Sequence, residues 1–288
     1  MEIRPWKAYR GVACALILVL LAVCENEGLR FGYRNSPTFT NWVRSHWHFV
    51  ESSLRLLRDC EWILAAYFFS GLRSVREFRS ETGLRDRWTP PGWLFACTAI
   101  GLGLLQLYAV HRGVSTENPS TANYYRAGEA YWSFFVVYAT LVAPFFEETV
   151  LRGFLYRAFR GSWGVVPSTA LVLSVMIYFH WGLVKESLVT LLLLIAGGSI
   201  LCAIREYTGN TWNCVVFHAA YNATVIRQWP VLILMVVVLL LLERRGKGED
   251  VSACDPQNIA TDPPSLGKVS KAGEGAEAPV VRDCLTLL

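Results

Sequence analysis

The sequence predicts an all-α protein: a polytopic transmembrane helix bundle of about eight membrane segments, followed by a disordered C-terminal tail. Of its 288 residues, 53% are hydrophobic and only 17% are charged, and the mean hydropathy is +0.33. This composition argues against a soluble globular domain. The apolar segments lie near residues 11–24, 61–72, 92–111, 130–151, 163–183, 187–204, 211–227 and 229–243.

These segments suggest three regions. Residues 1–129 hold the N-terminal membrane segments and interfacial loops, and residues 130–243 form the bundle that carries the unusual polar residues. Residues 244–288 are rich in Gly, Ala, Pro, Ser and charge, which predicts a disordered cytoplasmic tail. The loop of residues 25–60 holds Trp42, Trp47 and Phe49, which indicate a stretch lying on the membrane surface.

Basic residues orient the bundle. They cluster before the first segment, after the second, after the fourth and after the last, so alternating spans would bring all four clusters to one side. The positive-inside rule then places both termini in the cytoplasm of a multi-pass protein of the cell membrane, or of the endoplasmic reticulum in a eukaryote. The net charge of +4 fits this orientation and anionic lipid better than it fits nucleic acid, which is not an expected partner.

Two adjacent carboxylates and an arginine stand inside the fourth apolar segment, as Glu147, Glu148 and Arg152. Ionised groups in a membrane helix are costly and usually face a partner or a cavity, although they can also mark a membrane boundary. Glu148 and Arg152 are four residues apart and can pair on one helix face. Glu147 is rotated by about 100° from Glu148 and is free to meet another helix. Pro144, just before the acids, is expected to kink the helix.

Three further polar residues lie in the segments that follow. His180 and Glu147 are equally distant from the turn Gly161-Ser162-Trp163-Gly164, so an antiparallel hairpin would bring them to one depth. His218 and Asn222 share one face of a later helix. Taken singly, each has an ordinary explanation as a helix-packing residue. Zinc bound by Glu147, His180 and His218 is an alternative, but the sequence has no HExxH motif.

The order Glu147-Glu148-x-x-x-Arg152, a histidine closing the next helix, and His218-x-x-x-Asn222 resembles the CPBP family of intramembrane glutamic proteases. That family includes the type II CAAX prenyl endopeptidases and the Abi proteins. The resemblance covers roughly residues 130–226 and implies metal-free peptide hydrolysis with no cofactor. One departure is Met176, which stands where the family usually has the Phe of Phe-x-x-x-His.

The resemblance also implies a role for each site residue. Glu147 would activate water, His180 would hold that water, and Asn222 with His218 would polarise the scissile carbonyl. The pair of Glu148 and Arg152 would orient the helix. The implied substrate is a membrane-associated peptide or protein, prenylated or C-terminally anchored, in the lipid bilayer.

Two other classes of function remain open on the sequence. One is a non-proteolytic CPBP-like membrane protein that binds a partner or confers bacteriocin immunity, and Met176 is its best support. The other is a transporter, because intramembrane acids and histidines also relay protons. The apolar segments show no evident inverted repeat, which argues against a transporter.

Overall fold

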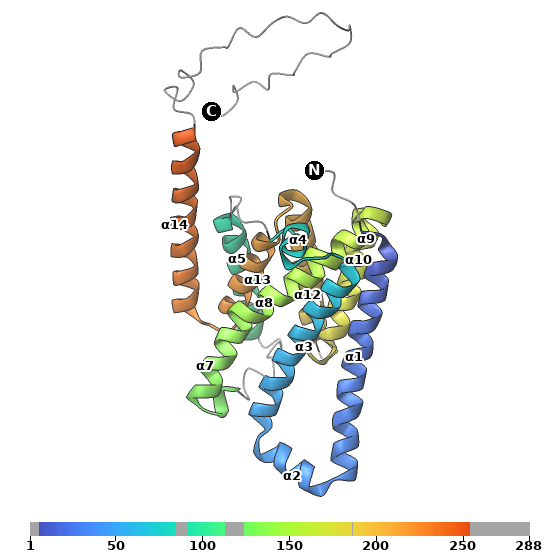
Figure 1. The fold of residues 1–288 in the computed structure, drawn as a ribbon. Coiled ribbons are helices and arrows are strands. Elements are labelled where there is room, and N and C mark those ends of the chain that lie inside the picture. Colours follow the sequence, from blue (N-terminus) through green and yellow to red (C-terminus); the bar gives the residue numbers. More distant parts are fainter. Residues whose placement is uncertain (1–5, 85–91, 113–123, 186, 254–288) are drawn as a thin grey trace, which may run out of the picture. The chain divides into compact units, whose positions relative to one another are not determined.

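The computed structural model describes residues 6–84, 92–112, 124–185 and 187–253, and all regular secondary structure in these ranges is helical (Figure 1). The predicted all-α class is therefore confirmed. Contacts along the chain define one unit of residues 1–247 and another of residues 248–288. Helix α14 (Trp229–Ala253) continues past residue 244, so the predicted tail begins as helix. The rest of that tail, residues 254–288, lies outside the described residues.

The N-terminal region is more helical than the sequence predicts. The expected loop of residues 25–60 is occupied by the end of α1 (Ala8–Asn35), by α2 (Pro37–Ser45) and by the first half of α3 (Trp47–Ser70). Its charges are paired: Arg55 donates to Glu51 at 2.8 Å within α3, and the Nε of Arg58 in α3 donates to Glu25 in α1 at 3.0 Å. Because these charges are paired, the stretch can form helices where the sequence predicts a loop. Helices α1 and α3 lie side by side, joined at one end by α2, and α4 (Val75–Glu81) follows (Figure 1).

The segment that carries the adjacent acids is one continuous helix, Glu129–Trp163. Pro144 lies in the first turn of α8 and has no N–H to give to a preceding turn. The π-helical stretch η1 ends just before α8, and a second stretch, η2, follows it. Such stretches often occur at functional sites. The parts are α7 (Glu129–Val137), η1 (Tyr138–Val142), α8 (Ala143–Glu148), η2 (Thr149–Leu155) and α9 (Tyr156–Trp163).

The next helices pack around this one. Gly164 has a φ of +81°, which glycine adopts without strain, and the chain turns there between α9 and α10. The other three residues of the predicted turn, Gly161 to Trp163, belong to α9. Helix α13 packs against α5, α12, α8 and η1, which makes it central to the bundle. The bounds are α5 (Gly92–His111), α10 (Val165–Phe179), α11 (Trp181–Val184), α12 (Leu188–Thr208) and α13 (Thr211–Val225).

Three helices among the described residues are long and apolar enough to cross a membrane: Ala8–Asn35, Glu129–Trp163 and Leu188–Thr208. Shorter apolar helices occupy Phe95–His111, Val165–Phe179 and Trp229–Leu241. The remaining two predicted segments, near residues 61–72 and 211–227, fall on α3 and α13, which are not among these six. The number of spans therefore stays a prediction.

Two apolar clusters hold the helices together. One joins α1, α3, η2, α9 and α10 and includes Leu18, Trp62 and Phe154. The other joins α5, α12, α13 and α14 and includes Ala99 and Phe217. The acidic helix segment α8 lies between elements of both clusters, because α3 and α13 each pack against it.

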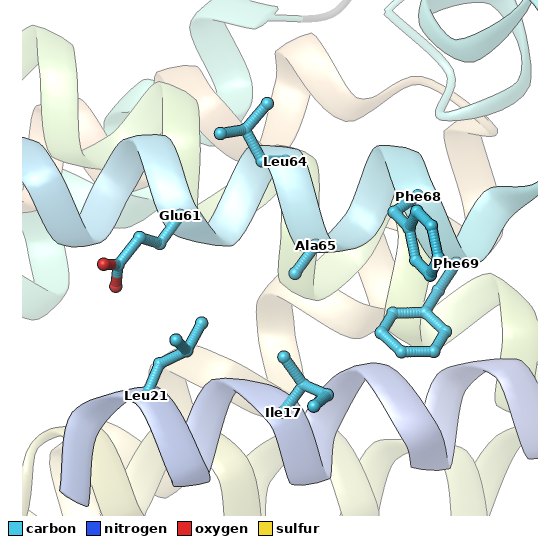
Figure 2. A pocket seen from close by; sticks show the side chains of 7 residues that line it. All are labelled: Ile17, Leu21, Glu61, Leu64, Ala65, Phe68 and Phe69. Atoms are coloured by element: carbon cyan, nitrogen blue, oxygen red, sulfur yellow. The ribbon is translucent and has the colours of Figure 1, made fainter. Parts of the chain in front are cut away.

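A shallow apolar groove of about 330 Å³ lies between α1 and α3. Figure 2 shows Ile17 and Leu21 of α1 facing α3, with the Glu61 carboxylate directed toward α1. Glu61 is two residues from Asp59 and so points to nearly the opposite side of α3. The groove is therefore separate from the polar cluster described next.

Candidate active site

Glu148 and Arg152 form a fully buried ion pair, each with a side chain that is 0% exposed. Arg152 Nη1 donates to Glu148 Oε1 at 3.1 Å, which is the pairing expected from their four-residue spacing. Arg152 Nη2 also donates to the carbonyl of Gly198 at 3.3 Å and to the Met176 sulfur at 3.4 Å. The guanidinium thus joins η2 to both α10 and α12.

Gly198 and Met176 shape this contact. A Cβ added at Gly198 would meet Met176 Cε at 2.4 Å and Leu173 Cδ2 at 2.5 Å, so glycine lets α12 approach α10 closely. Met176, 5% exposed, fills the position that is aromatic in the family pattern. Its flexible thioether fits an irregular space and its sulfur is a weak acceptor for Arg152. Packing and the bond from Arg152 therefore explain how Met176 can stand where the family usually has Phe.

His218 and Asn222 lie on one face of α13 and contact the acidic helix at different points. His218 Nδ1 is 2.8 Å from Glu148 Oε1, so the carboxylate that holds Arg152 also orients this imidazole. Asn222 Nδ2 donates to the carbonyl of Ala139 at 2.8 Å. Phe145 and Trp212 bring the two helices together, with ring centroids 5.6 Å apart. The sequence did not predict the bond from His218 to Glu148.

Glu147 differs from its neighbour. It is partly exposed, and none of the described residues forms a hydrogen bond or ion pair with its carboxylate. Asp59, Tyr138 and His218 all lie within electrostatic range of it. The adjacent acids therefore meet different surroundings, as their rotation around the helix predicts.

Helix α3 contributes residues that the sequence did not single out. Asp59 is 5% exposed and is hydrogen-bonded to Tyr138 of η1, while the Arg55 guanidinium lies 5.9 Å from the centroid of the Tyr138 ring. Asp59 stands in a charged stretch that also holds Arg58 and Glu61, and such a stretch is typical of a solvated helix face. No local sequence signal marks it as buried.

His180 ends α10, and its Nδ1 is 2.9 Å from the carbonyl of Met176. The preceding Phe179 packs on Trp62 of α3, with ring centroids 4.4 Å apart. No hydrogen bond joins His180 to Glu147, His218 or Asn222 within the described chain. The break between the two helices of the predicted hairpin lies at Gly164, and the meeting of His180 with Glu147 stays a prediction.

The residues proposed as zinc ligands are not gathered in one cluster. Within residues 6–84, 92–112, 124–185 and 187–253, no group of three or more His, Cys, Asp or Glu side chains is placed to hold a metal ion. Glu148 and His218 meet, and no hydrogen bond joins His180 to either of them within the described chain. The bonded polar groups here are the Glu148 carboxylate, the His218 imidazole and the Arg152 guanidinium.

Comparison with known proteins adds one finding. Residues 129–224 match the family model described as "Type II CAAX prenyl endopeptidase Rce1-like". Searches of curated proteins and of solved structures returned no match. The matched segment begins with α7 and contains all six residues that carry the resemblance in the sequence: Glu147, Glu148, Arg152, His180, His218 and Asn222. Residues 129–224 are therefore similar to the Rce1-like type II CAAX prenyl endopeptidases, and this match supports the CPBP family of proteases for this part of the chain.

Proposed function

We propose that this chain is an intramembrane endopeptidase that hydrolyses a peptide bond in a membrane-associated or lipidated polypeptide, with a water activated by Glu147. The family match supports a protease, and the three membrane-length helices support a substrate met at the bilayer. A prenylated or C-terminally anchored polypeptide fits both. We further propose a multi-pass arrangement with both termini cytoplasmic, from the basic clusters in the sequence.

The contrast between the two adjacent acids carries this proposal. Glu148 is fully buried and its Oε1 already receives Arg152 and His218. Glu147 is partly exposed and has no hydrogen-bond partner among the described residues. A general base needs an accessible carboxylate that can reach a water, and Glu147 alone of the pair meets that requirement.

The reaction can be written from these groups. Glu147 takes a proton from water while the water oxygen attacks the scissile carbonyl carbon and forms a tetrahedral intermediate. The proton then passes from Glu147 to the amine nitrogen as the C–N bond breaks, which releases a carboxylate product and an amine product. His180 would hold the water with Nε2, because its Nδ1 is bonded to the carbonyl of Met176.

Donors for the developing oxyanion come from α13. Asn222 uses one N–H on the carbonyl of Ala139 and keeps a second N–H for the substrate. His218 Nδ1 is held by Glu148 at 2.8 Å, and an imidazolium at this position would have a second donor at Nε2. Removing a donor of this kind typically slows turnover by about 100-fold or more.

The test compares C-termini of the membrane proteome in cells that lack the chain and are complemented with variants. Glu147→Gln keeps the size of the side chain and removes the base. Glu129→Gln, an exposed position at the start of the same helix, is the matched control. We expect a defined set of new C-termini with wild type and Glu129→Gln, and none with Glu147→Gln.

Purified full-length protein then gives turnover on an internally quenched peptide that contains one of these cleavage sites. At matched folded concentration, Glu147→Gln should lose nearly all turnover. Equal C-termini and equal turnover for wild type and Glu147→Gln would defeat the catalytic assignment. The polar cluster would then be structural.

A further inference from the structure

The interface between α5 and α13 is built largely from small and apolar side chains. Ala96 and Ala99 of α5 are fully buried and belong to the same apolar cluster as Ala220 of α13. Small residues let two membrane helices approach closely, but they make no directional contact that sets how one helix is rotated against the other. Such an interface by itself leaves the rotation of α13 weakly defined.

Gln106 adds a directional contact to this interface. It lies in α5 and is only 7% exposed, and the Tyr221 hydroxyl of α13 donates to its side-chain oxygen. Three residues away along both helices, a Cβ added at Gly103 would meet Thr224 Cβ and Cγ2 at 2.7 Å. The close approach at Gly103 sets the spacing of the two helices, and the polar bond beside it sets their rotation.

The same turn of α13 is also held at the candidate active site. His218 Nδ1 lies 2.8 Å from Glu148 Oε1. Asn222 Nδ2 donates to the carbonyl of Ala139 at 2.8 Å. Tyr221 precedes Asn222 and follows His218 by three residues, so all three side chains project from about one turn of helix. The contact with α5 is therefore made by the part of α13 that carries both proposed oxyanion donors.

We propose that Gln106 is a positioning residue of this site: through Tyr221 it sets the rotation of α13 and so aims Asn222 at the substrate carbonyl. This inference rests on the proposed role of Asn222 in the reaction. A side-chain tip lies about 5–6 Å from its helix axis, so a rotation of about 10° moves it by about 1 Å. A displacement of that size can slow turnover by about 100-fold. Gln106 lies outside residues 129–224, so the family match does not assign it a role.

The experiment uses variants of the full chain that remove the bond and keep the approximate size of each side chain. Gln106→Met removes the acceptor and Tyr221→Phe removes the donor, and each alone leaves the other polar group without its partner. The double variant removes both groups, so its thermal stability should return to near that of wild type. Tyr108→Phe is the matched control, because it removes the same hydroxyl from a tyrosine of α5 that is 60% exposed.

Stability and turnover should separate in the double variant. At matched folded concentration, its kcat on the internally quenched peptide defined above should fall by about 10-fold or more, with KM within about threefold of wild type. A residue that only stabilised the fold would recover its kcat together with its stability. In an Asn222→Ala background the same two substitutions should lower kcat by less than about threefold, because the group that they aim is already gone. Tyr108→Phe should match wild type in stability and in kcat.

A readout that needs no turnover keeps this test separate from the proposed function. Labelling the five histidines with ¹⁵N gives a ring signal for His218, which is identified by its loss in His218→Gln. A rotation of α13 changes the contact of His218 with Glu148. The signal should therefore shift in the double variant and keep its position in Tyr108→Phe.

Three results would overturn the positioning role of Gln106. They are a kcat within about threefold of wild type in the double variant, a loss of kcat that persists in full in the Asn222→Ala background, and an unshifted His218 signal. Equal turnover by wild type and Glu147→Gln would instead refute the proposed function. The His218 signal would then still decide whether the bond between Gln106 and Tyr221 sets the rotation of α13.

Discussion

The buried pair of Glu148 and Arg152 gives a sharp test of what holds the site together. Glu148→Gln leaves the Arg152 charge buried without its counter-ion, while the glutamine oxygen still accepts from Arg152 and His218. Arg152→Met leaves the Glu148 charge with His218 as its partner. Removing one member of a buried ion pair costs about 3–5 kcal/mol, and retained hydrogen bonds favour the lower end for Glu148→Gln.

The double variant should lose less stability than the two single variants lose together. With both charges gone, neither side chain is left as an uncompensated ion, so we expect a coupling free energy of about 2 kcal/mol or more. Each single variant should lower the apparent melting midpoint by about 6–20 °C, given about 3–5 kcal/mol and about 2–4 °C for each kcal/mol in a chain of this size. The assay is thermal loss of helical circular dichroism in detergent.

A surface pair supplies the matched control for this cycle. Arg160 and Glu206 are 2.8 Å apart with side chains 41% and 37% exposed. Glu206→Gln should change stability by less than about 1 kcal/mol, because water screens the exposed pair. Additive losses for the Glu148 and Arg152 variants, or losses no larger than that of Glu206→Gln, would refute the assignment of a strongly coupled buried pair.

Two further predictions concern metal and topology. Turnover should survive a strong chelator, because hydrolysis is assigned to Glu147; loss of activity that zinc restores, with zinc bound in proportion to protein, would assign the reaction to a metal site instead. Tags after Met1 and after Leu288 should both be cytoplasmic, and a tag within residues 115–121 should lie on the opposite face, as measured by protease protection. Protection of that internal tag together with a terminal tag would contradict the eight-segment prediction.

Local patterns predicted much of the fold and part of the site. The apolar segments correspond to helices, and the glycine at residue 164 marks the turn between α9 and α10. The spacing of Glu148 and Arg152 predicted their pairing, since residues four apart on a helix meet wherever the helix lies. These features depend only on neighbours in the sequence.

Contacts between distant segments were harder to predict. The charged stretch before residue 61 has the pattern of a solvated surface, yet Asp59 is buried there because α3 packs against α8. His218 was expected to act beside Asn222, and its bond to Glu148 depends on how α13 is rotated against α8. A sequence fixes which face a side chain occupies but not which helix covers that face.

The arrangement as a whole explains how one helix can carry two adjacent acids with separate tasks. Burial of Glu148 is tolerable because its carboxylate accepts from Arg152 of the same continuous helix and contacts His218 of α13. Burying both acids in this way would require a second set of cations, whereas the groups within electrostatic range of Glu147 include an acid, a phenol and an imidazole. Glu147 instead keeps a partly exposed carboxylate, which is what the proposed general base requires.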